Sequence, residues 1–246
     1  MSAATRVLGT ATASRTRPSR TPDGVDAVNR STPYGELMVR QSDRFTRSVE
    51  GSEFVANNAT PGTGITMQAS VTSYAATTPS LIVTNLSAVN DNKVLELEYI
   101  RILVATVPGG SGTQRFDARV DSIARYSSGG TTITPVNTYI GSDQTTLSRV
   151  YAGALTASAA GSGERLIAAG IARNGVGLAG DYFHFDFTGG HTGGNFLNPA
   201  TTVGLTTIIP MPEVALPANA SFLLNWWGAS LSTAAAWEFN IKFRER

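Results

Sequence analysis

From residue 51 onward, the chain is a succession of short apolar runs of strand length that are separated by turn residues. The clearest run is residues 237–243 (WEFNIKF), in which apolar and polar side chains alternate. A period of two places Trp237, Phe239, Ile241 and Phe243 on the inward face of a strand, with Glu238, Asn240 and Lys242 outward. Since no comparable helical pattern interrupts these runs, an all-β fold is expected.

The other runs support a sandwich of antiparallel strands. Residues 181–187 (DYFHFDF) place three phenylalanines on one face, and residues 221–228 (SFLLNWWG) carry bulky side chains on both faces, so both faces should be covered. Further strands are expected at residues 65–74, 80–86, 93–107, 116–126, 131–140, 147–155 and 202–209. This spacing predicts an antiparallel β-sandwich that is jelly-roll-like.

One stretch is ambiguous. Residues 152–172 are rich in alanine, which could support a short helix at residues 164–172. The flanking glycines favour a loop with short strands instead. Both interpretations stay open from the sequence.

Composition excludes several kinds of site. Leu, Ile, Val and Phe number 57, enough for a packed core, while charged residues make up only 15% of the 246 positions. The absence of cysteine and the presence of only two histidines exclude thiolate and histidine-rich metal sites, and no cofactor is predicted. A net charge of +1 gives no case for nucleic-acid binding, and no segment resembles a secretory signal or a membrane-spanning helix.

The chain divides into an extended N-terminal arm, residues 1–50, and a β domain, residues 51–246. The arm is basic and punctuated by proline, which is typical of an extended segment. Its arginines could bind an acidic surface, or the arm could be a solvated tail without a partner. The candidate partner-binding residues are Arg15, Arg17, Arg20, Arg40, Arg44 and Arg47.

No set of residues predicts catalysis. His184 and Asp186 would point the same way from one strand, as a general-base pair requires, but a polar face of a half-buried strand explains them as well. Glu96 and Glu98 share a face that is expected to be solvated, and no GxSxG motif occurs. The chain is therefore predicted not to be an enzyme.

Two residues are candidates for contacts with another subunit or with a glycan. Trp226 and Trp227 must point to opposite faces of their strand, so one belongs in the core and the other is covered or lies at an interface. His191 lies in the glycine-rich stretch GGHTGGN. We take Trp227 and His191 as these candidates; burial or a subunit contact is favoured over a glycan platform.

Two stretches carry a resemblance to a known group. The C-terminal sequence EVALPANASFLLNWWGASLSTAAAWEFNIKFRER resembles the end of virion jelly-roll proteins of tailed bacteriophages, with its proline-flanked turn, WWG strand end and final W-x-F-x-I strand. The sequence YGELMVRQSDRFTRSVEGSEFVANNATPGTGIT resembles the leader and first strand of the same group.

The resemblance implies a capsid cement or decoration protein, located at the capsid surface of the virion. It implies a homotrimer that binds the major capsid protein through the arm, with no nucleic acid, membrane or small-molecule cofactor as a partner. Arg outnumbers Lys by 17 to 2, which suits interface contacts. The alternative is a receptor-binding or glycan-binding head of a phage fibre or tail component.

Overall fold

The computed structural model describes residues 51–246, apart from residues 92, 108, 110–111, 176, 190–194, 197–204 and 229–232. The arm, residues 1–50, therefore lies outside the described residues, together with its six candidate arginines. His191 lies outside them as well.

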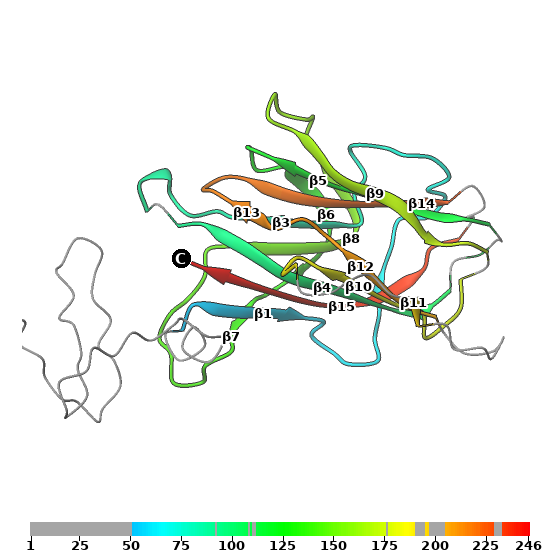
Figure 1. Cartoon of the computed structure of the whole chain (residues 1–246), viewed down its shortest axis with the longest axis horizontal. Helices are drawn as coiled ribbons and strands as arrows, with labels where there is room; N and C mark the ends of the chain where they lie inside the picture. Colours follow the sequence, from blue (N-terminus) through cyan, green and yellow to red (C-terminus); the bar gives the residue numbers. More distant parts are fainter. Residues whose placement is uncertain are drawn as a thin grey trace, which may run out of the picture. The chain divides into compact units, whose positions relative to one another are not determined.

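The described residues form two packed β-sheets, seen as two layers in Figure 1. The first sheet contains β1 (Glu53–Asn57), β2 (Ile65–Thr66), β4 (Leu95–Thr106), β7 (Val136–Asn137), β10 (Tyr182–Asp186), β11 (Asn195–Phe196), β12 (Thr206–Pro210), β13 (Val214–Leu216) and β15 (Ala236–Glu245). The second contains β3 (Leu81–Thr84), β5 (Gln114–Asp121), β6 (Tyr126–Ile133), β8 (Arg149–Ala157), β9 (Arg165–Arg173) and β14 (Ser221–Gly228). Within the described residues the only helical element is a short 3₁₀ turn, Val89–Asp91.

The order of the strands is that of a jelly roll. In the first sheet β1, β15, β4 and β10 are neighbours in that order, and in the second β3, β14, β5 and β9 are. Consecutive strands therefore alternate between the sheets along much of the chain, as two Greek keys require. The expected antiparallel, jelly-roll-like sandwich is confirmed, with one parallel pair, β10 with β12.

Aromatic side chains fill the space between the sheets. The ring of Trp226, from the second sheet, packs edge-on against Phe183 at 4.8 Å and against Trp237 at 5.0 Å, both from the first sheet. Phe116 of β5 packs against Phe185 of β10 at 5.2 Å. The inward positions expected for Trp237, Phe239, Ile241 and Phe243 are confirmed.

Part of the outward face of the second sheet is covered too. Ile82, Leu155 and Leu223 form a smaller buried cluster there, over which Tyr126 and Tyr151 stack with ring centroids 3.7 Å apart. Every residue of β14 except Trp227 is buried. The expectation that both faces of residues 221–228 are covered is confirmed.

Two expectations about elements were too broad, and one open choice is resolved. Of residues 65–74, only Ile65–Thr66 is strand. The chain turns at Ser70, where φ is +57°, and then crosses to the second sheet. There the Gly228 N–H donates a hydrogen bond to Val71 O. Residues 131–140 divide between β6 and β7, which lie in different sheets. Of the two interpretations left open for residues 152–172, the favoured one with strands agrees better with the structure: residues 165–173 form β9, whose pairing along β5 outweighs the helix propensity of alanine.

Candidate functional site

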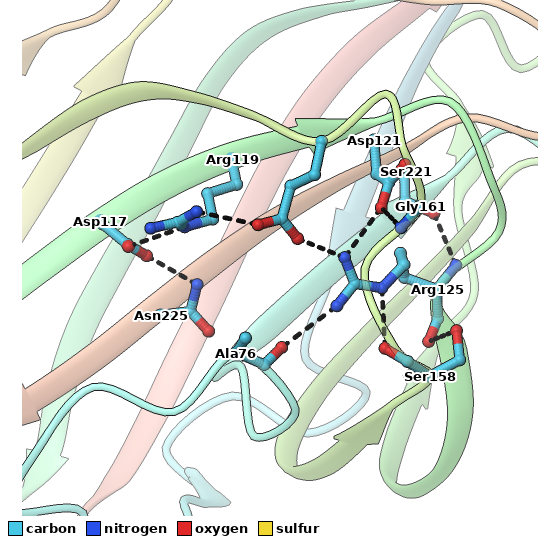
Figure 2. A network of polar contacts seen from close by, with 10 residues as sticks. Ala76, Asp117, Arg119, Asp121, Arg125, Ser158, Gly161, Ser221 and Asn225 are labelled. Carbon is cyan, nitrogen blue, oxygen red and sulfur yellow. Dashed lines mark hydrogen bonds and ion pairs between the residues drawn. The ribbon is translucent and has the colours of Figure 1, made fainter.

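A network of charged side chains lies on the outward face of the second sheet (Figure 2). Alternation along β5 directs Asp117, Arg119 and Asp121 outward, while Phe116 and Ala118 enter the core. Asn225 on the neighbouring strand β14 donates to Asp117 Oδ1 at 2.6 Å. The network is therefore fixed to two neighbouring interior strands of this sheet, β14 and β5.

Arg125, in the turn after β5, is the most buried member of the network. Its side chain has no solvent exposure, and Nη1 contacts Asp121 Oδ2 at 2.8 Å and Glu164 Oε2 at 2.5 Å. Nε donates to Ser158 O at 2.9 Å, and Nη2 donates to Ala76 O at 3.3 Å. One guanidinium thus joins the sheet to two separate loops.

Arg119 forms the second branch of the network. Its Nε contacts Asp117 Oδ2 at 2.9 Å, and its Nη1 contacts Glu164 Oε1 at 2.8 Å, so Glu164 bridges the two arginines. Burial alone would lower the Arg119 pKa, but the hydrogen bonds to Asp117 and Glu164 raise it overall. Arg119 is therefore held charged and in one orientation.

Tyr74 lies in the segment that crosses to the second sheet after β2, and its ring covers this branch of the network. The Arg119 guanidinium lies 4.8 Å from the centroid of the Tyr74 ring, which meets the Trp227 ring edge-on at 5.6 Å. Burial is the main cause that raises the Tyr74 pKa, and the nearby Asp117 carboxylate raises it further. We call this network the clamp, because its charged side chains hold separate segments of the chain together. Its members are Asp117, Arg119, Asp121, Arg125 and Glu164.

A partly exposed surface continues from the clamp toward the edge of the sheet. Cross-strand register aligns Ile171 of β9, Arg115 of β5 and Trp227 of β14 in one row on the outward face. Leu166 and Ala169 of β9 are aligned with Arg119 and Asp117 on the same face. We call the exposed part of this surface the β5–β9 face: Arg115, Leu166, Ala169, Ile171 and Trp227.

The structure thus places one of the predicted contact residues, Trp227, on this face. Trp226 is buried in the core, so the prediction that the two tryptophans point in opposite directions is confirmed. Trp227 is half-buried and lies against Tyr74. Its role in a subunit or glycan contact stays a prediction.

His184 and Asp186 lie on the outward face of the first sheet. The His184 ring is 5.7 Å from that of Tyr99 and 6.5 Å from that of Tyr182, nearly perpendicular to the latter. Asp186 is buried and accepts hydrogen bonds from the N–H and the hydroxyl of Thr188, at 3.0 and 2.7 Å. The carboxylate therefore helps to fix the turn that follows β10.

The expectation of a solvated face at Glu96 and Glu98 was wrong. Glu98 is buried, and Lys242 Nζ contacts Glu98 Oε2 at 3.2 Å and Glu53 Oε2 at 2.8 Å. Glu96 binds Arg244 and Arg246. The register of β15 against β4 shifts between Lys242 and Phe243, so that Glu98 is the extra residue of a bulge on β4, and this irregularity accompanies the pairing of Glu98 with Lys242.

Sequence reasoning missed the clamp. Arg125 stands in an unremarkable stretch, DSIARYSS, and Glu164 stands in a glycine-rich loop 39 positions later. The alternation of Asp117, Arg119 and Asp121 is visible in the sequence, but it is the pattern of an exposed strand face. Only the loops that fold over this face show that its charges are buried.

Within the described ranges, no group of three or more His, Cys, Asp or Glu side chains is arranged to hold a metal ion. No helix in the same part of the chain is long and apolar enough to cross a membrane. No family model, curated protein or solved structure matches the chain. Function therefore has to be inferred from the residues themselves.

Proposed function

We propose that this chain is a non-enzymatic virion structural protein of the capsid cement or decoration type. In this proposal the arm, residues 1–50, binds the major capsid protein, and the β domain, residues 51–246, contacts other copies in a homotrimer at the capsid surface. The observation that carries the proposal is the jelly-roll order of the strands, because it is the fold that the resemblance to phage virion proteins implies.

A second observation supports the same proposal. The C-terminal stretch that carries the resemblance supplies β14 and β15, and each of these is an interior strand of its sheet. β15 lies between β1 and β4, and β14 lies between β3 and β5. The residues that carry the resemblance to phage virion proteins thus form an interior strand of each sheet, as expected if the resemblance reflects the fold.

Deleting residues 1–22 tests the role of the arm. The deletion removes Arg6, Arg15, Arg17 and Arg20, so binding to particle shells that lack this protein should be lost while the β domain stays folded. Cosedimentation with the shells measures binding, and circular dichroism measures folding. A full-length variant with these four arginines changed to Gln separates charge from length. Full binding by the truncated chain would refute the role of the arm.

The second candidate function is a receptor-binding or glycan-binding head. It is favoured by the partly exposed ring pair of Trp227 and Tyr74, since aromatic faces beside a guanidinium suit a sugar. Binding to a glycan array or to whole cells that is lost in Trp227→Ala and His191→Ala, and kept in Tyr182→Ala, would support it. Absence of binding at micromolar protein would count against it.

A further inference from the structure

The β5–β9 face has the composition of a protein-binding surface. Leu166 and Ile171 each expose 53% of their area, and Trp227 lies in the same row as Ile171 and Arg115. Large apolar side chains that are grouped on a surface mark interaction sites, and Trp and Arg are enriched among the residues that dominate binding energy. The face therefore provides an apolar centre beside an arginine.

The unpaired charge at this face is positive. Asp117 and Glu164 are bound by Arg119, and Asp121 is bound by Arg125. Arg115 is exposed in the middle of the face. It forms no ion pair within the part of the chain that the structure describes.

The clamp beside the face fixes its shape in advance. Arg119 is held by two carboxylates and lies against the Tyr74 ring, which in turn contacts Trp227. A contact surface that is already ordered loses less conformational entropy on binding than a mobile one does. The clamp thus supports a binding face as well as the fold.

Contact through the face is favoured over pairing along the edge of β9. The register of β9 against β5 shifts twice, so that Ile167 and Ala172 have no partner on β5. Bulges of this kind make an edge strand irregular and oppose the addition of another strand. A partner protein would therefore contact the outward-facing side chains of the β5–β9 face rather than add a strand beside β9.

We propose that the β5–β9 face docks onto an acidic protein surface that has an apolar centre. A second copy of the chain related by a two-fold axis fits less well, because the face offers no unpaired carboxylate and would bring arginines together without acidic partners. A glycan fits less well because Leu166 and Ile171 are aliphatic and present no ring to a sugar. If the proposed function holds, the acidic surface belongs to the capsid shell, and this part of the inference rests on it.

The test uses full-length protein and particle shells that lack it. Ile171→Glu and Arg115→Glu should each weaken binding to the shells by about tenfold or more, because they place a carboxylate against an acidic, apolar partner. Ile140→Glu is the matched control, since Ile140 is fully exposed in the loop after β7. All variants should keep the melting temperature of the wild type, and the wild-type complex should weaken as salt is raised.

The possible results separate this inference from the proposed function. Wild-type binding that both variants retain would overturn the docking face and leave the proposed function standing. Failure of the wild type to bind shells would remove the proposed function and this docking face with it. Self-association or glycan-array binding that is lost in Ile171→Glu, with shell binding intact, would overturn the choice of partner.

Discussion

Arg125 shows how much of this fold depends on a single side chain. Its guanidinium is removed from solvent and contacts two carboxylates and two backbone carbonyls from separate parts of the chain. A buried pair of charges contributes little net stability, but loss of one partner leaves the others buried and unpaired. The residue is therefore more important for keeping the loops in place than its charge alone suggests.

Arg125→Ala should destabilise the protein by about 3–5 kcal/mol, because Asp121 and Glu164 lose their common partner. Urea unfolding measures the change. Arg149→Ala is the control, since Arg149 is only half-buried and its closest hydrogen bond, to Ser148 O, is 3.1 Å long; its expected cost is about 1 kcal/mol or less. Equal stability of the two variants would contradict a structural clamp at Arg125.

Tyr74 gives the clamp a dependence on alkaline pH. Its pKa is raised above the ordinary value of 10.0, chiefly by burial, so the folded state binds the phenolic proton more tightly than the unfolded state does. This contribution to stability is complete below pH 10 and is lost as the pH rises through the raised value. Tyr151 and Tyr182 have pKa values raised by burial as well and act in the same direction.

Wild-type protein should therefore lose stability above pH 10, and Tyr74→Phe should lose it less steeply. Melting temperatures measured across this range, with tyrosinate absorbance as a parallel readout, provide the test. Tyr182→Phe removes a tyrosine outside the clamp whose pKa is also raised, so it should flatten the profile too and gives the size of the effect when the clamp is left intact. The interpretation fails if Tyr74→Phe follows the same pH profile as the wild type.

At the scale of elements, β8 can approach β2 closely because of one glycine. Gly153 has φ of +109°, and a Cβ there would lie 2.9 Å from Ile65 Cγ2 and 2.9 Å from Thr66 O. Gly62 has a similar φ of +82°, with no atom within 4 Å of the place of a Cβ. The two positions share the backbone penalty and differ in the space around them.

Gly153→Ala should therefore cost about 1–3 kcal/mol more than Gly62→Ala, because only the first creates an overlap between elements. The free energies of unfolding in urea give the comparison. Similar losses for the two variants would mean that backbone strain alone decides the effect, and that the contact between β8 and β2 is loose.

The alternation of apolar and polar residues predicted the strands that bury apolar side chains in the core. The runs around Phe183 and Trp237 alternate without interruption, so the sequence itself shows which side of each strand faces the core. The β15–β4 register shift at Glu98 and the strand pairing of residues 165–173 depend on partners far away in the sequence. No local pattern contains that information, so the buried charges were missed, and for residues 152–172 the sequence favoured only a loop with short strands where the structure has the full-length strand β9.

At the scale of the whole molecule, the outward face of the second sheet is only partly covered. The segment that contains Tyr74 and the loop that contains Glu164 fold over its middle, while the β5–β9 face at its edge stays exposed. The composition predicted a β protein with few charges, and it gave no sign of which surface would remain open. The candidate Trp227 lies at the boundary between the covered and exposed parts.

The location of the protein in its particle is the most direct test of a role in the virion. Cryo-electron microscopy or gold labelling of the particle would show where the copies lie. The account predicts copies spread over the shell at the junctions between capsomers, with the β5–β9 face toward the shell. Copies confined to a tail or fibre tip, or a particle without the protein, would contradict it.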